Sequence, residues 1–255
     1  MPTRSPLLFV LLAVALEVLF VRLGFWQLAR RGEREEASAF RQARASMPTL
    51  RLPQGDGAAA AAALPSRDSV VWRRVRLSGR FDSEREIVLR SRSRLGLPGV
   101  ELLTPLLVRA EGRPDEAILV LRGWLPANDG LRPRLSEAWP PGWTGDDPGT
   151  TMEVEGIAMS GTNWAGAPIH IDIDGSRRAV LGSTNLETAR GLLPYPVADF
   201  YVRATDPGPP GAGLAPLQEL VAGEGRHLSY AIQWFAFAII SLVGAGIFLR
   251  KEHGR

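Results

Sequence analysis

The stretch LLFVLLAVALEVLFVRLGFWQL at residues 7–28 and the stretch LSYAIQWFAFAIISLVGAGIFL at residues 228–249 decide the architecture of this chain. Each is about 22 residues long, and a helix rising about 1.5 Å per residue needs roughly 20 predominantly apolar residues to cross a bilayer. The second stretch holds no charge and is followed directly by Arg250 and Lys251. The sequence therefore predicts a membrane protein with one helical span near each end.

Cleavage of the first stretch as a secretory signal peptide is the competing interpretation. Its apolar run exceeds the apolar region of about 7–15 residues that signal peptides carry, and no small-x-small cleavage site precedes Arg30 and Arg31. We therefore expect transmembrane helices at residues 7–29 and 227–249.

Two spans place both termini on the same side of the membrane, so only two orientations are possible. The basic residues that flank the spans determine which of the two is adopted. The flanks disagree: a cytoplasmic C-terminus is favoured by Arg250, Lys251 and Arg255, and the opposite orientation by Arg30, Arg31 and Arg34. A long intervening segment contributes little to insertion. We expect the tails 1–6 and 250–255 in the cytoplasm and domain 30–226 on the outer face of the plasma (inner) membrane.

The composition excludes several functions. The chain has no cysteine, which excludes disulfides and thiolate chemistry. Its pI near 9.9 accompanies a formal charge of only +3 without a long basic run, which argues against a nucleic-acid interface. The lipid bilayer is therefore an expected partner, and nucleic acid is not.

The segment between the spans reads as strands separated by Pro and Gly, with little helix. Strands are expected at residues 70–81, 86–91, 100–108, 117–125, 152–159, 169–174, 178–182 and 200–205, helices at 30–46 and 186–192, and loops at 53–65 and 139–150. The predicted fold is two transmembrane α-helices flanking one mostly-β (α+β) extramembrane domain, in the form of a partly closed barrel.

One strand in this domain carries metal-ligand residue types. His170, Asp172 and Asp174 alternate with isoleucines and would share one face of a strand, as a metal-dependent hydrolase could require. Alternation is equally typical of any half-buried strand, and no catalytic motif accompanies it. We therefore predict no enzyme.

A stripe at the start of the second span carries the more specific chemistry. His227, Tyr230 and Trp234 are spaced i, i+3 and i+7, which a helix places on one side. Imidazole is a good axial ligand for heme iron, and aromatic rings give a flat macrocycle a surface, although an aromatic belt at the membrane interface has the same composition.

Small and ionisable residues of the spans suggest helix contacts. The small residues Ala231, Ala238, Gly244 and Gly246 predict close approach of the first span. Glu17 and Arg22 lie within the first span, where an ionisable residue is a functional candidate by default. Arg22 can instead snorkel, and Glu17 can pair with a neighbouring helix.

Five blocks in order resemble the surfeit locus protein 1 family of cytochrome c oxidase assembly factors. They are Leu23-Gly24-Phe25-Trp26-Gln27-Leu28-Ala29-Arg30; Trp72-Arg73-Arg74-Val75 with Gly79-Arg80-Phe81; Pro98-Gly99-Val100 with Thr104-Pro105-Leu106; Arg122-Gly123-Trp124; and His227-Leu228-Ser229-Tyr230-Ala231-Ile232-Gln233-Trp234. The chain departs from the family pattern at Leu121, where Asn is usual, and at Asn185, where an acid is expected.

The resemblance implies an assembly factor for a heme-copper terminal oxidase that binds heme a and aids its delivery to the catalytic subunit. His227 would be the axial ligand of the heme iron, and Trp234 and Tyr230 would complete the cofactor-binding site. Heme a synthase is a further expected partner. The alternative is a cofactor-free membrane scaffold that stabilises an oxidase assembly intermediate.

Overall fold

The computed structural model describes residues 6–52, 64–108, 116–138, 150–164, 166–206, 213–217 and 227–253. Contacts divide the chain into two compact units, Met1–Arg41 with Leu220–Arg255, and Gln42–Glu219. We call the first the helical unit, which contains most of α1 (Pro6–Ala45) and all of α4 (His227–His253), and the second the β domain. Most of the predicted loops 53–65 and 139–150 lies outside the described residues.

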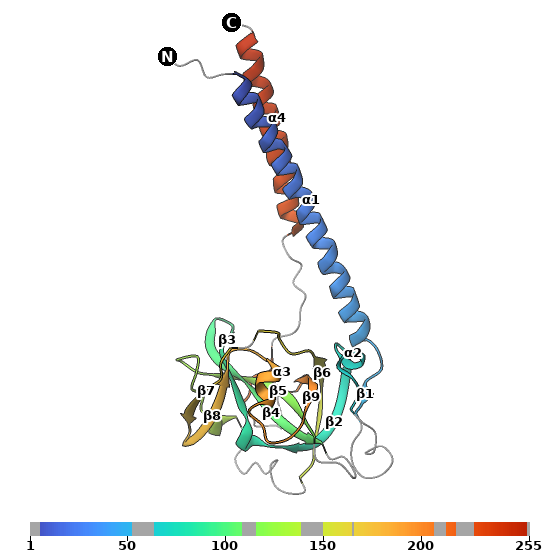
Figure 1. The fold of residues 1–255 in the computed structure, drawn as a ribbon, viewed down its shortest axis with the longest axis vertical. Coiled ribbons are helices and arrows are strands. Elements are labelled where there is room, and N and C mark those ends of the chain that lie inside the picture. Colours follow the sequence, from blue (N-terminus) through green and yellow to red (C-terminus); the bar gives the residue numbers. More distant parts are fainter. Residues whose placement is uncertain are drawn as a thin grey trace. The chain divides into compact units, whose positions relative to one another are not determined.

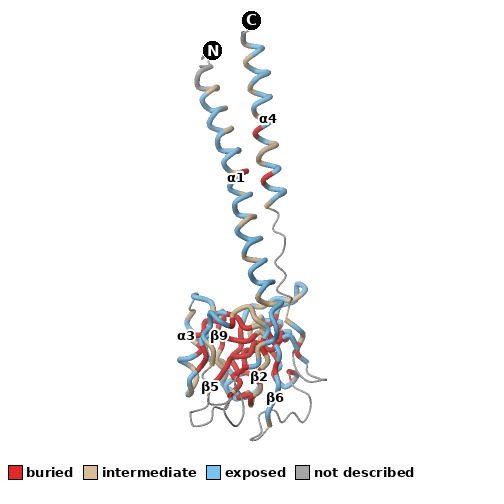
Figure 2. The backbone as a smooth tube through the Cα atoms, turned by 90° about the vertical axis from the view of Figure 1, so that its right-hand side faces the viewer, coloured by how far each residue is buried: buried red, intermediate tan, exposed pale blue. Residues whose placement is uncertain are grey.

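Helices α1 and α4 confirm the two predicted spans. Both are long and apolar enough to cross a membrane, and only 6% of the most apolar window of each is buried. The exposed colour therefore covers most of both helices in Figure 2. Exposed leucine, isoleucine and phenylalanine side chains are what a lipid-facing helix presents.

Helix α1 continues beyond the apolar stretch to Ala45, in agreement with the helix predicted at residues 30–46. Ion pairs follow one another on its surface, with Arg30 to Glu33 and Arg31 to Glu35 both at 2.6 Å. Pairs at i, i+3 and i, i+4 stabilise a helix where its apolar face has ended. The helix stops at Ala45.

Among the described residues, nine strands form one sheet in the β domain, one more than predicted. Their order is β1-β2-β6-β9-β5-β4-β3-β8-β7. The bounds are β1 (Leu50–Arg51), β2 (Arg74–Phe81), β3 (Ile87–Arg94), β4 (Leu97–Val108), β5 (Glu116–Pro126), β6 (Met152–Met159), β7 (Ile169–Ile173), β8 (Ser176–Leu181) and β9 (Val197–Ala204). Short helices α2 (Arg67–Val70) and α3 (Leu186–Arg190) and the 3-10 turns Ser83–Arg85 and Leu135–Glu137 complete the domain.

A second pairing of β2 closes part of this sheet. β2 pairs with β4 as well as with β6, with Phe81 opposite Leu106, so β2, β6, β9, β5 and β4 form a closed five-stranded barrel (Figure 1). A Cβ atom on Gly79 would lie 2.4 Å from the carbonyl oxygen of Leu107, so only glycine fits beside the closure. The prediction of a partly closed barrel is confirmed.

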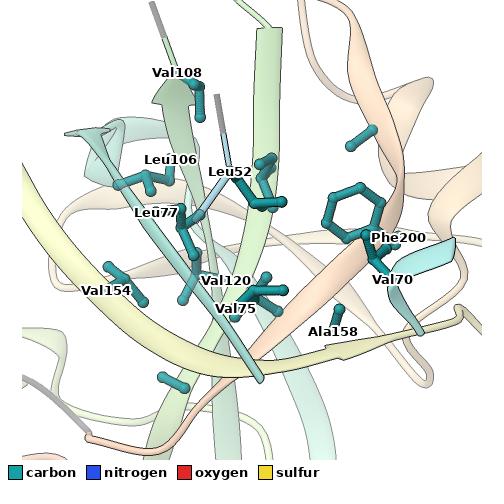
Figure 3. Close-up of a cluster of buried hydrophobic side chains, with 14 of the residues drawn as sticks. Leu52, Val70, Val75, Leu77, Leu106, Val108, Val120, Val154, Ala158 and Phe200 are labelled. Carbon is teal, nitrogen blue, oxygen red and sulfur yellow. The ribbon is translucent and has the colours of Figure 1, made fainter. Parts of the chain in front are cut away.

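Alternating inward side chains fill the barrel. Along β2 the residues Val75, Leu77 and Phe81 are buried, whereas Arg74 is exposed. They pack with side chains of the other strands around Phe200, which is fully buried (Figure 3). Period-two burial of β-branched and aromatic residues is the pattern that predicted these strands.

The first predicted strand was too long and the first real one was missed. Residues 70–73 do not belong to β2: Val70 ends α2, and Trp72 has a φ of 67° that no strand accommodates. The apolar character of Val70 and Trp72 comes from packing against the core rather than from a strand. β1 has only two residues, too few for any periodic signal.

The departure from the family pattern at Asn185 has a structural explanation. Asn185 is buried and caps α3, accepting from the N–H of Thr188 at 2.8 Å while its Nδ2 donates to the carbonyl of Thr162 at 2.9 Å. Asp and Asn cap helices about equally well, but only Asn supplies the donor. The amide therefore joins α3 to the segment after β6.

Substituting Asn185 with Asp should lower the free energy of unfolding by about 1–3 kcal/mol, because the carbonyl of Thr162 loses its donor and faces a carboxylate. Thermal unfolding of the detergent-purified protein measures this. The exposed Asn128→Asp is the matched control and should change stability by less than about 0.5 kcal/mol. Equal effects of the two substitutions would contradict the bridging role of Asn185.

Candidate functional site

The two spans pack along a continuous seam. Figure 1 shows α1 and α4 side by side and antiparallel, and ring contacts recur along them, with centroid distances of 4.3 Å for Phe9–Phe248 and 5.9 Å for Phe20–Trp234. The least exposed positions of each helix recur at spacings of three and four, which is the packing pattern of paired helices. They include Glu17, Phe20, Gly24 and Gln27 on α1, and His227, Ala231, Trp234 and Ala238 on α4.

Gly24 permits the closest approach on this seam. It is buried, and a Cβ atom there would lie 2.6 Å from ring carbons of Phe235. Ala231 and Ala238 are also buried, as predicted. The prediction for Gly244 and Gly246 was wrong, because both are exposed and a Cβ atom on either meets nothing within 4 Å.

His227 and Gln27 meet at one end of the seam. The N–H at Nδ1 of His227 donates to Oε1 of Gln27 at 2.8 Å. Because an amide oxygen can only accept, Nδ1 carries a proton in this contact, and in the neutral imidazole Nε2 then carries the lone pair. That Nε2 atom is buried and has no hydrogen-bond partner among the described residues. An imidazole fixed through one nitrogen and unsatisfied at the other has the form of a metal-ligating histidine.

Gln27 was not identified as a site residue from the sequence, although it stands in the first family block. The transmembrane topology could have indicated this residue. Antiparallel spans place the end of the first and the start of the second at the same membrane surface, so polar residues at those two positions can meet.

The other two predicted site residues lie differently. Trp234 is on the seam, nearly parallel to Phe20 at 5.9 Å and edge-on to Phe237 at 5.9 Å. Tyr230 is 46% exposed, outside the seam. The structure therefore brings His227 and Trp234 onto the side of α4 that faces α1, and it leaves Tyr230 at the surface of the pair.

Glu17 lies ten residues from Gln27, about 15 Å deeper along the helix axis. Its Oε1 atom is buried and has no hydrogen-bond partner among the described residues, whereas Arg22 is exposed. This carboxylate oxygen is therefore enclosed within the helical unit.

The polar strand of the β domain does not form a metal site. His170 and Asp172 are exposed on β7, and Asp174 lies in the turn after it with a φ of 48°, accepting from the N–H of Ser136. Within the part of the chain that the structure describes, no three His, Cys, Asp or Glu side chains are grouped to hold a metal ion.

The Arg122-Gly123-Trp124 block belongs to the core of the domain. The register places Leu121 opposite Leu103 and Gly123 opposite Leu102, so Arg122 is the extra residue of a β-bulge. Its side chain is 3% exposed, with the guanidinium 4.2 Å from the ring centre of Phe81. The block therefore fixes the barrel and is not a surface feature.

Other buried polar groups of the domain are paired within it. The hydroxyl of Thr104 donates to Glu86 at 2.6 Å, and the hydroxyl of Tyr195 donates to Asp82 at 2.9 Å. Burial, followed by the hydrogen bond to Asp82, raises the pKa of Tyr195, so this phenol remains a donor at neutral pH. These groups hold elements together, because their polar atoms are occupied by each other.

Known proteins resemble this chain over almost its whole length. The model of the SURF1 family matches residues 14–239. A SURF1-like protein of Rickettsia felis is 26% identical over 238 residues, covering 91% of this chain and 93% of that protein. An uncharacterized SURF1-like protein of Mycobacterium tuberculosis is 28% identical over 238 residues (91% and 79%), and a SURF1-like protein of Monosiga brevicollis is 26% identical over 242 residues (91% and 84%).

The match confirms the resemblance drawn from the five blocks, and it includes both residues of the His227–Gln27 contact. The chain therefore belongs to the SURF1 family, a family of cytochrome oxidase assembly factors.

Proposed function

We propose that this membrane protein binds heme a through His227 and delivers it to the catalytic subunit of a heme-copper terminal oxidase. The observation that carries the proposal is the buried, unpartnered Nε2 of an imidazole whose Nδ1 is fixed by Gln27. The sequence spacing selects His227, and the geometry adds that Nδ1 is engaged by Gln27 while Nε2 has no hydrogen-bond partner among the described residues. Family membership supplies the oxidase context.

The chain's own residues account for binding and orientation. Gln27 fixes the tautomer and ring direction of His227, so the lone pair of Nε2 is held ready for iron. Trp234 and Phe20, about 10 Å farther along the helix axis, supply an apolar aromatic surface suited to a flat macrocycle. The heme iron would accept the nitrogen donor that His227 offers. Binding through a single imidazole, without covalent attachment, would allow the heme to be released to the oxidase subunit.

The location and partners belong to the same proposal. The C-terminal Arg250 and Lys251 favour the inner membrane orientation with the β domain on the outer face. Heme a synthase would supply the cargo, and the oxidase subunit would receive it. The SURF1 family is an assembly-factor family, so we assign the chain no catalytic reaction of its own.

The visible spectrum of the detergent-purified protein, co-expressed with heme a synthesis, tests this function. A Soret band is expected for the wild type and for Tyr230→Phe, and no band for His227→Ala. A band that survives His227→Ala would assign the ligand elsewhere. Absence of a band in every variant, with oxidase assembly intact in His227→Ala cells, would favour the cofactor-free scaffold.

The role of Gln27 gives a second prediction for the same spectrum. Gln27→Leu retains the side-chain length but removes the acceptor for Nδ1, so the affinity for heme should fall about 10–100-fold. Titration of the apoprotein with heme measures this. The matched control is Gln233→Leu, the same change at an exposed position of α4. Equal affinities of both variants would show that Gln27 does not orient the ligand.

A further inference from the structure

The hairpin between β3 and β4 ends in an exposed apolar tip. Arg94 pairs with Leu97 across a two-residue turn made of Leu95 and Gly96, whose φ angles are 51° and 81°. Leu95 is 83% exposed and Leu97 is 61% exposed. No other large hydrophobic side chain among the described residues is as exposed as Leu95.

A leucine is an unexpected choice at this position. Two-residue turns with positive φ at both residues favour Asn, Asp or Gly at the first position, because a branched side chain is strained there. The other such turn in the domain, Asp174-Gly175, follows this preference. The β3–β4 turn thus combines two unfavourable features, a strained backbone and leucine side chains that are exposed to water. A partner that covered these leucines would offset their free-energy cost.

Basic residues precede the tip on β3. Between residues 87 and 100 the only charged side chains are Arg90, Arg92 and Arg94, alternating along β3. Arg92 pairs with Glu101 at 3.2 Å and Arg94 donates to the carbonyl of Pro216 at 3.2 Å, while Arg90 is exposed. An apolar tip next to these three arginines, which we call the basic collar, complements a layer of phosphate headgroups above acyl chains.

An exposed tryptophan lies beside the collar. Trp164 is 62% exposed and covers Gly182, where a Cβ atom would lie 3.1 Å from the indole and 3.9 Å from Nε of Arg90. Tryptophan is enriched where protein meets the headgroup layer, because its ring is apolar and its N–H is polar. Arg90 and Trp164 therefore extend the same surface.

The hairpin is held in place before any partner arrives. The indole N–H of Trp124 donates to the carbonyl of Arg92, and the N–H of Ser91 donates to the carbonyl of Gly130. Pro216, whose carbonyl accepts from Arg94, is eleven residues before His227, where α4 begins. The spans tether the domain to the bilayer, which raises the effective concentration of lipid at its surface.

We propose that Leu95 and Leu97, with Arg90 and Trp164, dock the β domain on the anionic phospholipid surface of the membrane that its spans cross. The leucines enter the boundary between headgroups and acyl chains, and the arginines contact phosphate groups. This contact is independent of heme and goes beyond the proposed function.

The absence of cysteine makes a direct test possible. Leu95→Cys in the full chain is labelled with an environment-sensitive fluorophore and placed in nanodiscs of phosphatidylcholine with or without phosphatidylglycerol. We expect a blue-shifted emission, quenched by a nitroxide near the lipid headgroup, with a contact population several-fold higher when phosphatidylglycerol is present. Asp174→Cys, at the equivalent position of the other turn, is the matched control and should remain in water.

Charge reversal tests the basic collar. Arg90→Glu should reduce lipid quenching of the label at position 95 about fivefold or more, with the unfolding temperature unchanged. A label at position 95 that remains open to aqueous iodide in both kinds of nanodisc would overturn the proposal. Protection that appears only when the oxidase catalytic subunit is added would also overturn it and assign the tip to a protein partner.

Discussion

Arg122→Met is expected to lower the free energy of unfolding of the β domain by about 2 kcal/mol. Among the described residues, Arg122 is the one buried cation, and its guanidinium lies 4.2 Å from the ring centre of Phe81. Methionine has a similar length but removes this desolvated contact between the cation and the ring. Denaturant unfolding of the detergent-purified protein measures the loss.

The control for this prediction is Arg74→Met, the same change at an exposed position of β2. It should alter stability by less than about 0.5 kcal/mol. Arg122→Lys retains the charge but not the planar guanidinium and should fall between the two. If Arg122→Met is no more damaging than Arg74→Met, the arginine is not part of the folding core, and a role in binding an external partner would have to be considered.

Gly24→Leu is expected to separate α1 from α4 and to abolish the His227–Gln27 hydrogen bond. The new Cβ atom would overlap the ring of Phe235, and overpacking of this kind costs about 1–3 kcal/mol. Spin labels on cysteines introduced at the exposed positions Val18 and Ile239 should report a longer, broader distance distribution. The Soret band should be lost with it.

The same helix pair offers a control and a rescue. Gly244→Leu places an equal side chain where nothing lies within 4 Å, so distances and spectrum should stay as in the wild type. Adding Phe235→Ala to Gly24→Leu returns the space and should restore part of both signals. A wild-type distance distribution in Gly24→Leu would mean that Gly24 does not set the approach of the helices.

The spans and most strands could be predicted because their signals are local. An apolar stretch of sufficient length is enough for a membrane helix, and β6 has the bounds that its alternation predicted. Trp72 was misplaced because a large apolar residue indicates burial without specifying its backbone conformation. Gly244 and Gly246 were misinterpreted because glycine permits close approach without showing which helix face is used.

The candidate site was predictable only in part. His227 and Trp234 stood out because one helix carries both, and their roles as heme contacts stay predictions. Gln27 is 200 positions from its partner, so no spacing rule links them. The burial of Arg122 depends on a β-bulge, which arises from the pairing of two strands and has no signature in either one.

The closure of the barrel sets an order of events during synthesis. β9 ends at Ala204 and is the strand that joins β5 to β6, so β2, which ends at Phe81, waits for roughly 120 further residues before the ring can close. At about 5–20 residues per second, the nascent domain spends roughly 6–25 s with strand edges open. The nascent β domain is therefore vulnerable to proteolysis and aggregation after the first span has been synthesised. This period ends shortly before the second span is translated.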